Sequence, residues 1–216
     1  MNARLSFTSS RAARLALVVG AALSIAFAGC SVTRTSPVKQ MYLLEPPLPS
    51  APVAKTQPGV LRIDAFNVAS PYRGRSFVFR TTDLQFESDF YNEFIVSPAA
   101  NIADATAHGL QRAKAFDQVL APGAPVDADW LLEGFVSALY GDNRQAGRPA
   151  ADVTISYFLS RAEGGRGVPF WTRQYAKRVE YSGTSASAYA EAVNKAVGEI
   201  IGELARDLSA AQLPAK

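Results

Sequence analysis

The sequence predicts an α/β domain in which a β-sheet of mixed direction is covered by two long helices. Three observations predict this class. Strand-like segments lie on both sides of a first helical segment, three more strand-like segments follow one another between residues 130 and 181, and a long amphipathic helix comes last. This order places strands in one sheet and leaves two helices that must each bury an apolar stripe against it.

The first half of the domain predicts short strands. Residues 60–68 alternate apolar and polar side chains, which is typical of a half-buried strand. Residues 77–81 predict a second strand, and residues 84–87 predict a third after a turn. Residues 116–120 predict a further short strand after the first helix.

Two helices are predicted from start signals and spacing. The first begins near Ser97-Pro98, because serine suits the N-cap and proline suits the first helical position. The second covers about residues 187–211, and its apolar positions form one continuous stripe: Val193, Val197, Ile200, Ile201, Leu204 and Leu208.

Three successive strands are predicted in the second half, at residues 130–140, 153–160 and 168–181. The middle one alternates strictly between apolar and polar or aromatic side chains. Residues 163–167 contain three glycines and predict a hairpin turn, so we expect the last two strands to be antiparallel neighbours.

An export signal precedes the domain. Residues 15–29 are apolar or small, they follow three arginines without any acidic residue, and they end at Cys30, the only cysteine. This pattern is typical of a secretory signal, and it is shorter than the ~20 residues that span hydrocarbon. The run Phe27-Ala28-Gly29-Cys30 resembles the lipobox of bacterial lipoproteins, although Phe27 stands where leucine is usual. We therefore expect residues 1–29 to be removed and Cys30 to be lipidated.

Residues 30–58 predict a tether, and residues 59–213 predict the folded domain. The tether is polar and contains six prolines, which fix φ and remove hydrogen-bond donors. Residues 41–44 are an apolar exception within it. They are either an edge strand docked on the domain or an apolar spot in a loop. Ser31, in the second position of the mature chain, favours the outer membrane with the domain facing the periplasm.

The charge of the mature chain excludes a nucleic-acid footprint. The whole chain has 22 basic and 19 acidic residues, and residues 1–29 contain three of the basic ones, so 19 basic residues face 19 acidic ones after cleavage. Nucleic-acid binding needs a clustered basic surface. With its one cysteine lipidated, the mature chain forms no disulfide, so its stability must come from a packed core.

The sequence predicts no enzyme, no cofactor and no metal site. His108 is the only histidine, so Cys/His catalysis and most zinc sites are excluded. We expect His108 to be a solvated helix residue beside Asp104. No Gly-x-Ser-x-Gly motif stands at a strand-to-helix turn. The glycines of residues 164–167 precede a strand, where a phosphate cradle would precede a helix.

Two clusters predict contacts with a partner, because tyrosine and arginine are frequent anchors of interfaces. The predicted contact residues of the first cluster are Tyr72, Arg73, Arg75 and Arg80, and those of the second are Phe90, Tyr91 and Phe94. The alternative is structural. In that case Phe90 and Phe94 cap the core, and the arginines pair with nearby acidic residues.

An ordered set of segments resembles a known family. The segments are Tyr42-Leu43-Leu44, Leu61-Arg62-Ile63, Pro71-Tyr72, the strand 77–80, Phe90-Tyr91, and Ala128-Asp129-Trp130 with the strand that follows. Together with the lipobox, they are similar to the ABC-type transport auxiliary lipoproteins, the PqiC-like family, over nearly the whole mature chain. The chain departs from the family at Phe94 and Ile95, where a tryptophan-type residue is frequent, and at residues 73–75, where an acidic residue often precedes the arginine.

The resemblance implies a non-catalytic accessory of a transporter. Such proteins resemble partners of MCE-domain proteins, which act with an ABC permease and ATPase to move lipids between two membranes. The implied fold is a three-layer sandwich like an anticodon-binding domain, and the implied assembly is a homo-oligomer. The alternative function is a stand-alone envelope lipoprotein that binds a lipid or a cell-wall ligand in its own cleft.

Overall fold

The computed structural model describes residues 38–162 and 168–214. The predicted signal peptide, the lipidation site Cys30 and the predicted turn at residues 163–167 lie outside the described residues. Residues 38–216 group as one compact unit.

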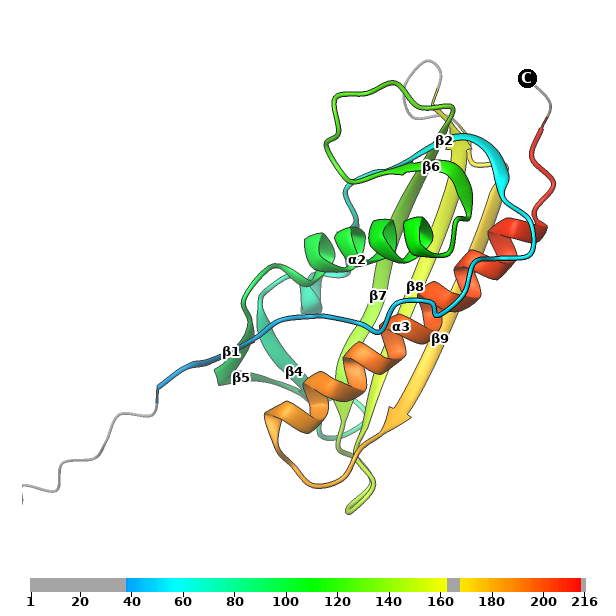
Figure 1. The fold of residues 1–216 in the computed structure, drawn as a ribbon. Helices are drawn as coiled ribbons and strands as arrows, with labels where there is room; N and C mark the ends of the chain where they lie inside the picture. Colours follow the sequence, from blue (N-terminus) through cyan, green and yellow to red (C-terminus); the bar gives the residue numbers. More distant parts are fainter. Residues whose placement is uncertain (1–37, 163–167, 215–216) are drawn as a thin grey trace, which may run out of the picture. The chain divides into compact units, whose positions relative to one another are not determined.

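A long central strand, β7 (Trp130–Asp142), organises the sheet (Figure 1). One edge of β7 pairs in parallel, one after another along its length, with three short strands: β2 (Gln57–Ile63), β3 (Asn67–Val68) and β4 (Ser76–Arg80). The other edge pairs antiparallel with β8 (Ala150–Arg161), which pairs antiparallel with β9 (Trp171–Glu180). The predicted antiparallel neighbours are therefore confirmed.

The remaining strands extend the sheet beyond β2 and β4. β6 (Phe116–Leu120) lies parallel to β2. β5 (Phe86–Phe94) lies antiparallel to β4, and the short edge strand β1 (Gln40–Tyr42) lies parallel to β5. Parallel and antiparallel pairs occur together, so the predicted mixed direction is confirmed.

Both long helices lie on the same face of the sheet (Figure 1). α2 (Pro98–Arg112) and α3 (Ala186–Ala210) also contact each other. Gly109 of α2 permits this approach, because a Cβ atom there would overlap the side chain of Ile201. The predicted mixed sheet with two long helices is confirmed, but sheet and helices form two layers where the resemblance implies three.

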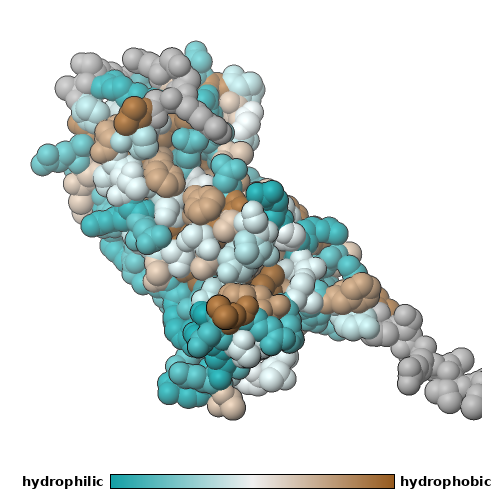
Figure 2. All heavy atoms as spheres, turned by 180° about the vertical axis from the view of Figure 1, so that it is seen from behind, coloured by the Kyte–Doolittle hydropathy of each residue, from teal (hydrophilic) through white to brown (hydrophobic). Residues whose placement is uncertain are grey.

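No helix of the described residues covers the second face of the sheet (Figure 1), because this face is largely polar (Figure 2). Thr154 and Ser156 of β8 and Gln174 of β9 lie in register on this face and are partly or fully exposed. Figure 2 shows this side of the molecule, where hydrophilic residues dominate and hydrophobic residues form small separate patches. An apolar helix stripe would find little apolar surface to bury here.

Residues 43–56, which we call the strap, cross the outer side of the two helices between β1 and β2 (Figure 1). Leu44 is 4% exposed, and its carbonyl accepts a hydrogen bond of 2.6 Å from the Asn101 amide of α2. The backbone N–H of Val53 donates to the carbonyl of Ala113 at 2.8 Å. Prolines suit such a path because they bring no N–H group that needs a partner.

The strap changes the predicted division of the chain. The folded unit begins at Val38 and not at residue 59, so residues 38–58 are not a free tether. Of the two alternatives for residues 41–44, the edge strand is correct for its first half, because β1 pairs with β5. The predicted strand at 60–68 divides into β2 and β3, and the predicted strand at 84–87 becomes the longer β5.

Candidate functional site

Two of the seven predicted contact residues, Tyr72 and Arg80, lie together with Tyr140 and Phe86 in a group that we call the closed cluster. Tyr72 ends the 3₁₀ helix η1 (Ser70–Tyr72), is 8% exposed, and stacks on Tyr140 with ring centroids 6.0 Å apart. Burial raises the pKa of the Tyr72 phenol. Phe86 packs edge-on against Tyr140, and Arg80 lies over the Phe86 ring while donating to the carbonyl of Asp83 at 2.7 Å. Tyr72 is thus buried, and Arg80 is engaged with Asp83 as the structural alternative expects.

The other two arginines lie in the loop before β4. Arg75 donates to Glu93 at 3.1 Å (Nη2 to Oε1) and to the carbonyl of Ile95 at 3.2 Å. Lys39 lies 3.4 Å from the second oxygen of Glu93, whose side chain is only 8% exposed. Arg75 therefore also has an acidic partner, as the alternative requires. Arg73 is exposed.

The three predicted contact residues of β5 differ in how far they are buried. Phe94 is 2% exposed and packs against Phe77 with ring centroids 4.7 Å apart, so it caps the core. Phe90 is 69% exposed and Tyr91 is 43% exposed, and the two rings contact each other edge-to-face at 5.1 Å. The Lys39 ammonium lies 5.1 Å above the Phe90 ring. Phe90 and Tyr91 remain available for contact, and that role stays a prediction.

Further exposed apolar side chains lie on or beside β1 and directly after β5, at the same edge of the sheet as Phe90 and Tyr91. We call this surface the β1–β5 corner, and its members are Val38, Met41, Leu43, Phe90, Tyr91, Ile95 and Val96. Sequence reasoning missed five of them, because only strand pairing places β1 beside the end of β5. The usable signal was the alternation in residues 41–44: Tyr42 packs on Phe77 and Leu44 is buried, while Met41 and Leu43 point outward.

A buried carboxylate was also missed. Asp142 ends β7 with its side chain 3% exposed. Arg144 donates to both of its oxygens at 2.9 and 2.8 Å, and Arg178 of β9 donates to it at 2.9 Å. These hydrogen bonds, those from Arg144 first, hold the pKa of Asp142 well below its usual range. The ionised Asp142 carboxylate thus links the end of β7 to Arg178 of β9.

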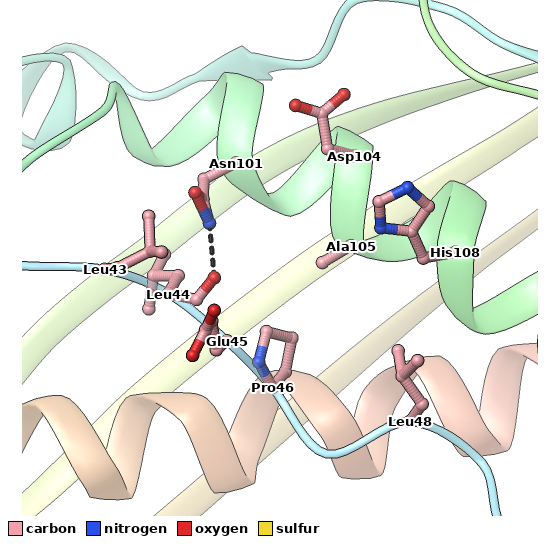
Figure 3. Close-up of a pocket in the computed structure, with 9 residues that line it drawn as sticks. All are labelled: Leu43, Leu44, Glu45, Pro46, Leu48, Asn101, Asp104, Ala105 and His108. Carbon is pink, nitrogen blue, oxygen red and sulfur yellow. Dashed lines mark hydrogen bonds between the residues drawn. The ribbon is translucent and has the colours of Figure 1, made fainter.

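A shallow hollow of about 380 Å³ lies between the strap and α2 (Figure 3). Figure 3 shows the dashed bond from Asn101 to the Leu44 carbonyl, with Asp104 and His108 on successive turns of α2. Both of these residues are exposed, so His108 is a solvated helix residue as predicted. Within residues 38–162 and 168–214, no group of three or more metal-ligating side chains comes together. Neither described helix is long and apolar enough to cross a bilayer.

Comparison with known proteins reveals the fold and no more. No family model and no curated protein matches this sequence. A DUF330 protein from Xanthomonas campestris has a similar structure, with a TM-score of 0.65 and 17% identity over 76% of this chain and 92% of that chain. An uncharacterized protein matches with a TM-score of 0.61 and 16% identity over 80% of this chain and 99% of that chain. At these identities, the likeness shows a shared fold.

Proposed function

We propose that this protein is a lipoprotein of the outer membrane that faces the periplasm and docks an MCE-type ABC lipid transport system without catalysing a reaction. The observation that carries the proposal is the fold shared with the DUF330 protein, because DUF330 corresponds to the PqiC-like family that the sequence resembles. The lipobox ending at Cys30 supports attachment to a membrane. The same resemblance supports assembly of several copies.

A docking protein of this kind would lower the free-energy cost of moving a lipid between two membranes. A lipid that leaves a membrane exposes its chains to water, at a cost of ~0.8 kcal/mol for each CH₂ group. A protein bridge between the membranes avoids this exposure, and its outer end must be held at the outer membrane. Several acyl chains on one cysteine give durable attachment, whereas one chain is marginal. The open face of the sheet (Figure 2) supplies surface for contacts with the partner.

Co-purification tests the proposal. The tagged full chain is cross-linked in cells and purified from detergent-solubilised envelope, with a Cys30→Ser variant as matched control. We expect the wild-type chain to incorporate labelled palmitate, to fractionate with the outer membrane, and to bring an MCE-domain protein with its permease and ATPase. The Cys30→Ser variant loses the label and the fractionation. A fully acylated chain that repeatedly purifies without any MCE-domain protein contradicts the docking role.

The alternative, a stand-alone lipoprotein with its own ligand, makes a different prediction. The hollow at the strap is shallow, and the described helices bury their stripes directly on the sheet. For the docking role we therefore expect mass spectrometry of extracts from the purified protein to find no lipid at a fixed stoichiometry beyond the anchor. One bound lipid or cell-wall fragment for each chain supports the alternative.

A further inference from the structure

The β1–β5 corner lies where the described chain begins, and this fixes how far it can be from Cys30. Because residues 38–58 belong to the folded unit, the part of the chain between the anchor and the domain is residues 30–37. The eight residue steps from Cys30 to Val38 span at most about 28 Å when fully extended. A free tether up to residue 59 would reach about 100 Å. The anchor therefore keeps this corner, and not the far end of the domain, close to the bilayer.

The corner also has the composition of a surface that enters a lipid interface. Phe90 is 69% exposed, Met41 is 55% exposed, and Ile95 is 48% exposed, so apolar atoms face outward over the ends of both strands. Hydrophobic side chains gather on the projecting end of the unit that carries β1 (Figure 2). Aromatic residues with neighbouring lysine or arginine are typical of the boundary between headgroups and acyl chains.

The charges at the corner favour lipid headgroups. Two acidic side chains there are engaged: Glu93 is buried between Lys39 and Arg75, and Asp89 accepts the backbone N–H groups of Tyr91 and Asn92. The cations keep much of their surface, since the side chains of Lys39 and Arg75 are 44% and 48% exposed. Cations beside a bilayer attract its anionic lipids within a Debye length.

We propose that the β1–β5 corner seats on the lipid bilayer that holds the Cys30 anchor. Phe90, Tyr91 and Ile95 enter the boundary between headgroups and acyl chains, and Lys39 and Arg75 meet phosphate groups. A short linker gives the corner an effective concentration in the millimolar range at the bilayer, so a weak apolar patch is sufficient. This inference rests on the lipid anchor of the proposed function and adds which end of the domain faces the membrane.

Tryptophan probes in the acylated mature chain test whether the β1–β5 corner contacts the bilayer. Phe90→Trp and Ile95→Trp place a probe on the corner. Val126→Trp places one at a site of matched exposure, 50% against 48% for Ile95, in the loop between β6 and β7. Each protein is reconstituted into vesicles of phosphatidylethanolamine and phosphatidylglycerol, with and without lipids that carry a doxyl quencher high on the acyl chain. The signal of native Trp130 and Trp171 is measured in the unsubstituted chain and subtracted.

We expect the two corner probes to be quenched at least about twofold more strongly than the Val126→Trp probe, because a seated side chain lies ~5–10 Å inside the interface. Corner probes quenched no more than the control, in protein whose acyl mass is verified, overturn the seat and indicate a protein or a second copy as occupant. That failure leaves MCE co-purification unaffected, so it is distinguishable from failure of the docking role. A chain without an acyl mass overturns both the anchor and the seat.

Discussion

The closed cluster around Tyr72 and the β1–β5 corner both place a cation over an aromatic ring, yet Tyr72 is buried and Phe90 is exposed. Arg80 lies over Phe86 in the first, and Lys39 lies over Phe90 in the second. Tyr72 precedes β4 and Arg80 ends it. This strand lies between β5 and β7 and has neighbours on both edges. Phe90 lies on β5, whose outer edge pairs only with the three residues of β1. Position in the sheet, and not residue type, decides which cluster remains exposed.

The sharpest test of this comparison uses two phenylalanines of one strand. Phe94→Ala removes a ring that is 2% exposed and packed on Phe77, so we expect a loss of about 3–5 kcal/mol in the free energy of unfolding. Phe90→Ala removes a ring that is 69% exposed, so we expect a change within about 0.5 kcal/mol. Urea unfolding of the mature chain, followed by circular dichroism, measures both. Equal losses would mean that Phe90 is also part of the core.

The two regions also differ in how they hold a buried carboxylate. Asp142 accepts four hydrogen bonds from two arginines, counting the Arg144 backbone N–H, whereas Glu93 faces Lys39 and Arg75 at 3.4 and 3.1 Å. Asp142→Asn removes the negative charge that both Arg144 and Arg178 bind. We expect a loss of about 2–3 kcal/mol at neutral pH, at the lower end for a buried pair because the arginines are partly exposed.

The loss from Asp142→Asn should depend on pH in a defined direction. The pKa of Asp142 is lowered on folding, so its ionised form stabilises the protein fully above the unfolded value of about 3.9. This stabilisation disappears as the pH falls below that value toward the lower folded pKa. The difference between wild type and variant in unfolding free energy should therefore be constant above about pH 5 and shrink in more acidic solution. Asp83→Asn, whose side chain is 84% exposed, is the matched control and should change little.

Local sequence signals predicted most of the elements but not their surroundings. The final helix is predicted within one residue at each end, since the stripe from Val193 to Leu208 defines one buried face. β6 is predicted at residues 116–120 as observed. Ser97 and Pro98 mark the start of α2 as expected, although the Ser97 side chain makes no capping hydrogen bond. Periodicity and start signals act within one segment, so the sequence alone contains them.

Long-range placement could not be read from the same signals. Prolines in residues 37–58 are equally compatible with a free tether and with the strap, because both need extended backbone without ladder bonds. The pairing of β1 with β5 joins residues about fifty positions apart, and no local pattern encodes it. The same holds for the pairing of Asp142 with Arg178 of β9. The exposed surface at the β1–β5 corner depends on these contacts, which is why only Phe90 and Tyr91 of it were predicted.

The strap continues from β1 and holds the corner in place, so its packing on α3 should contribute to the free energy of unfolding. A Cβ atom at Gly198 of α3 would lie 2.6 Å from Cγ of Pro47 and 2.8 Å from its carbonyl oxygen. Gly198→Ala must therefore push the strap outward, and we expect a net loss of about 1–2 kcal/mol despite the gain in helix propensity. At Gly202 the nearest atom is 3.7 Å away, on the flexible Arg206 side chain, so Gly202→Ala should stabilise by up to ~1 kcal/mol.

Urea unfolding and limited proteolysis distinguish these two glycines. Cleavage within residues 43–56 should be faster in Gly198→Ala than in wild type and unchanged in Gly202→Ala, because only the first substitution loosens the strap. If both alanines stabilise the protein equally, the strap does not pack on α3 at Pro47.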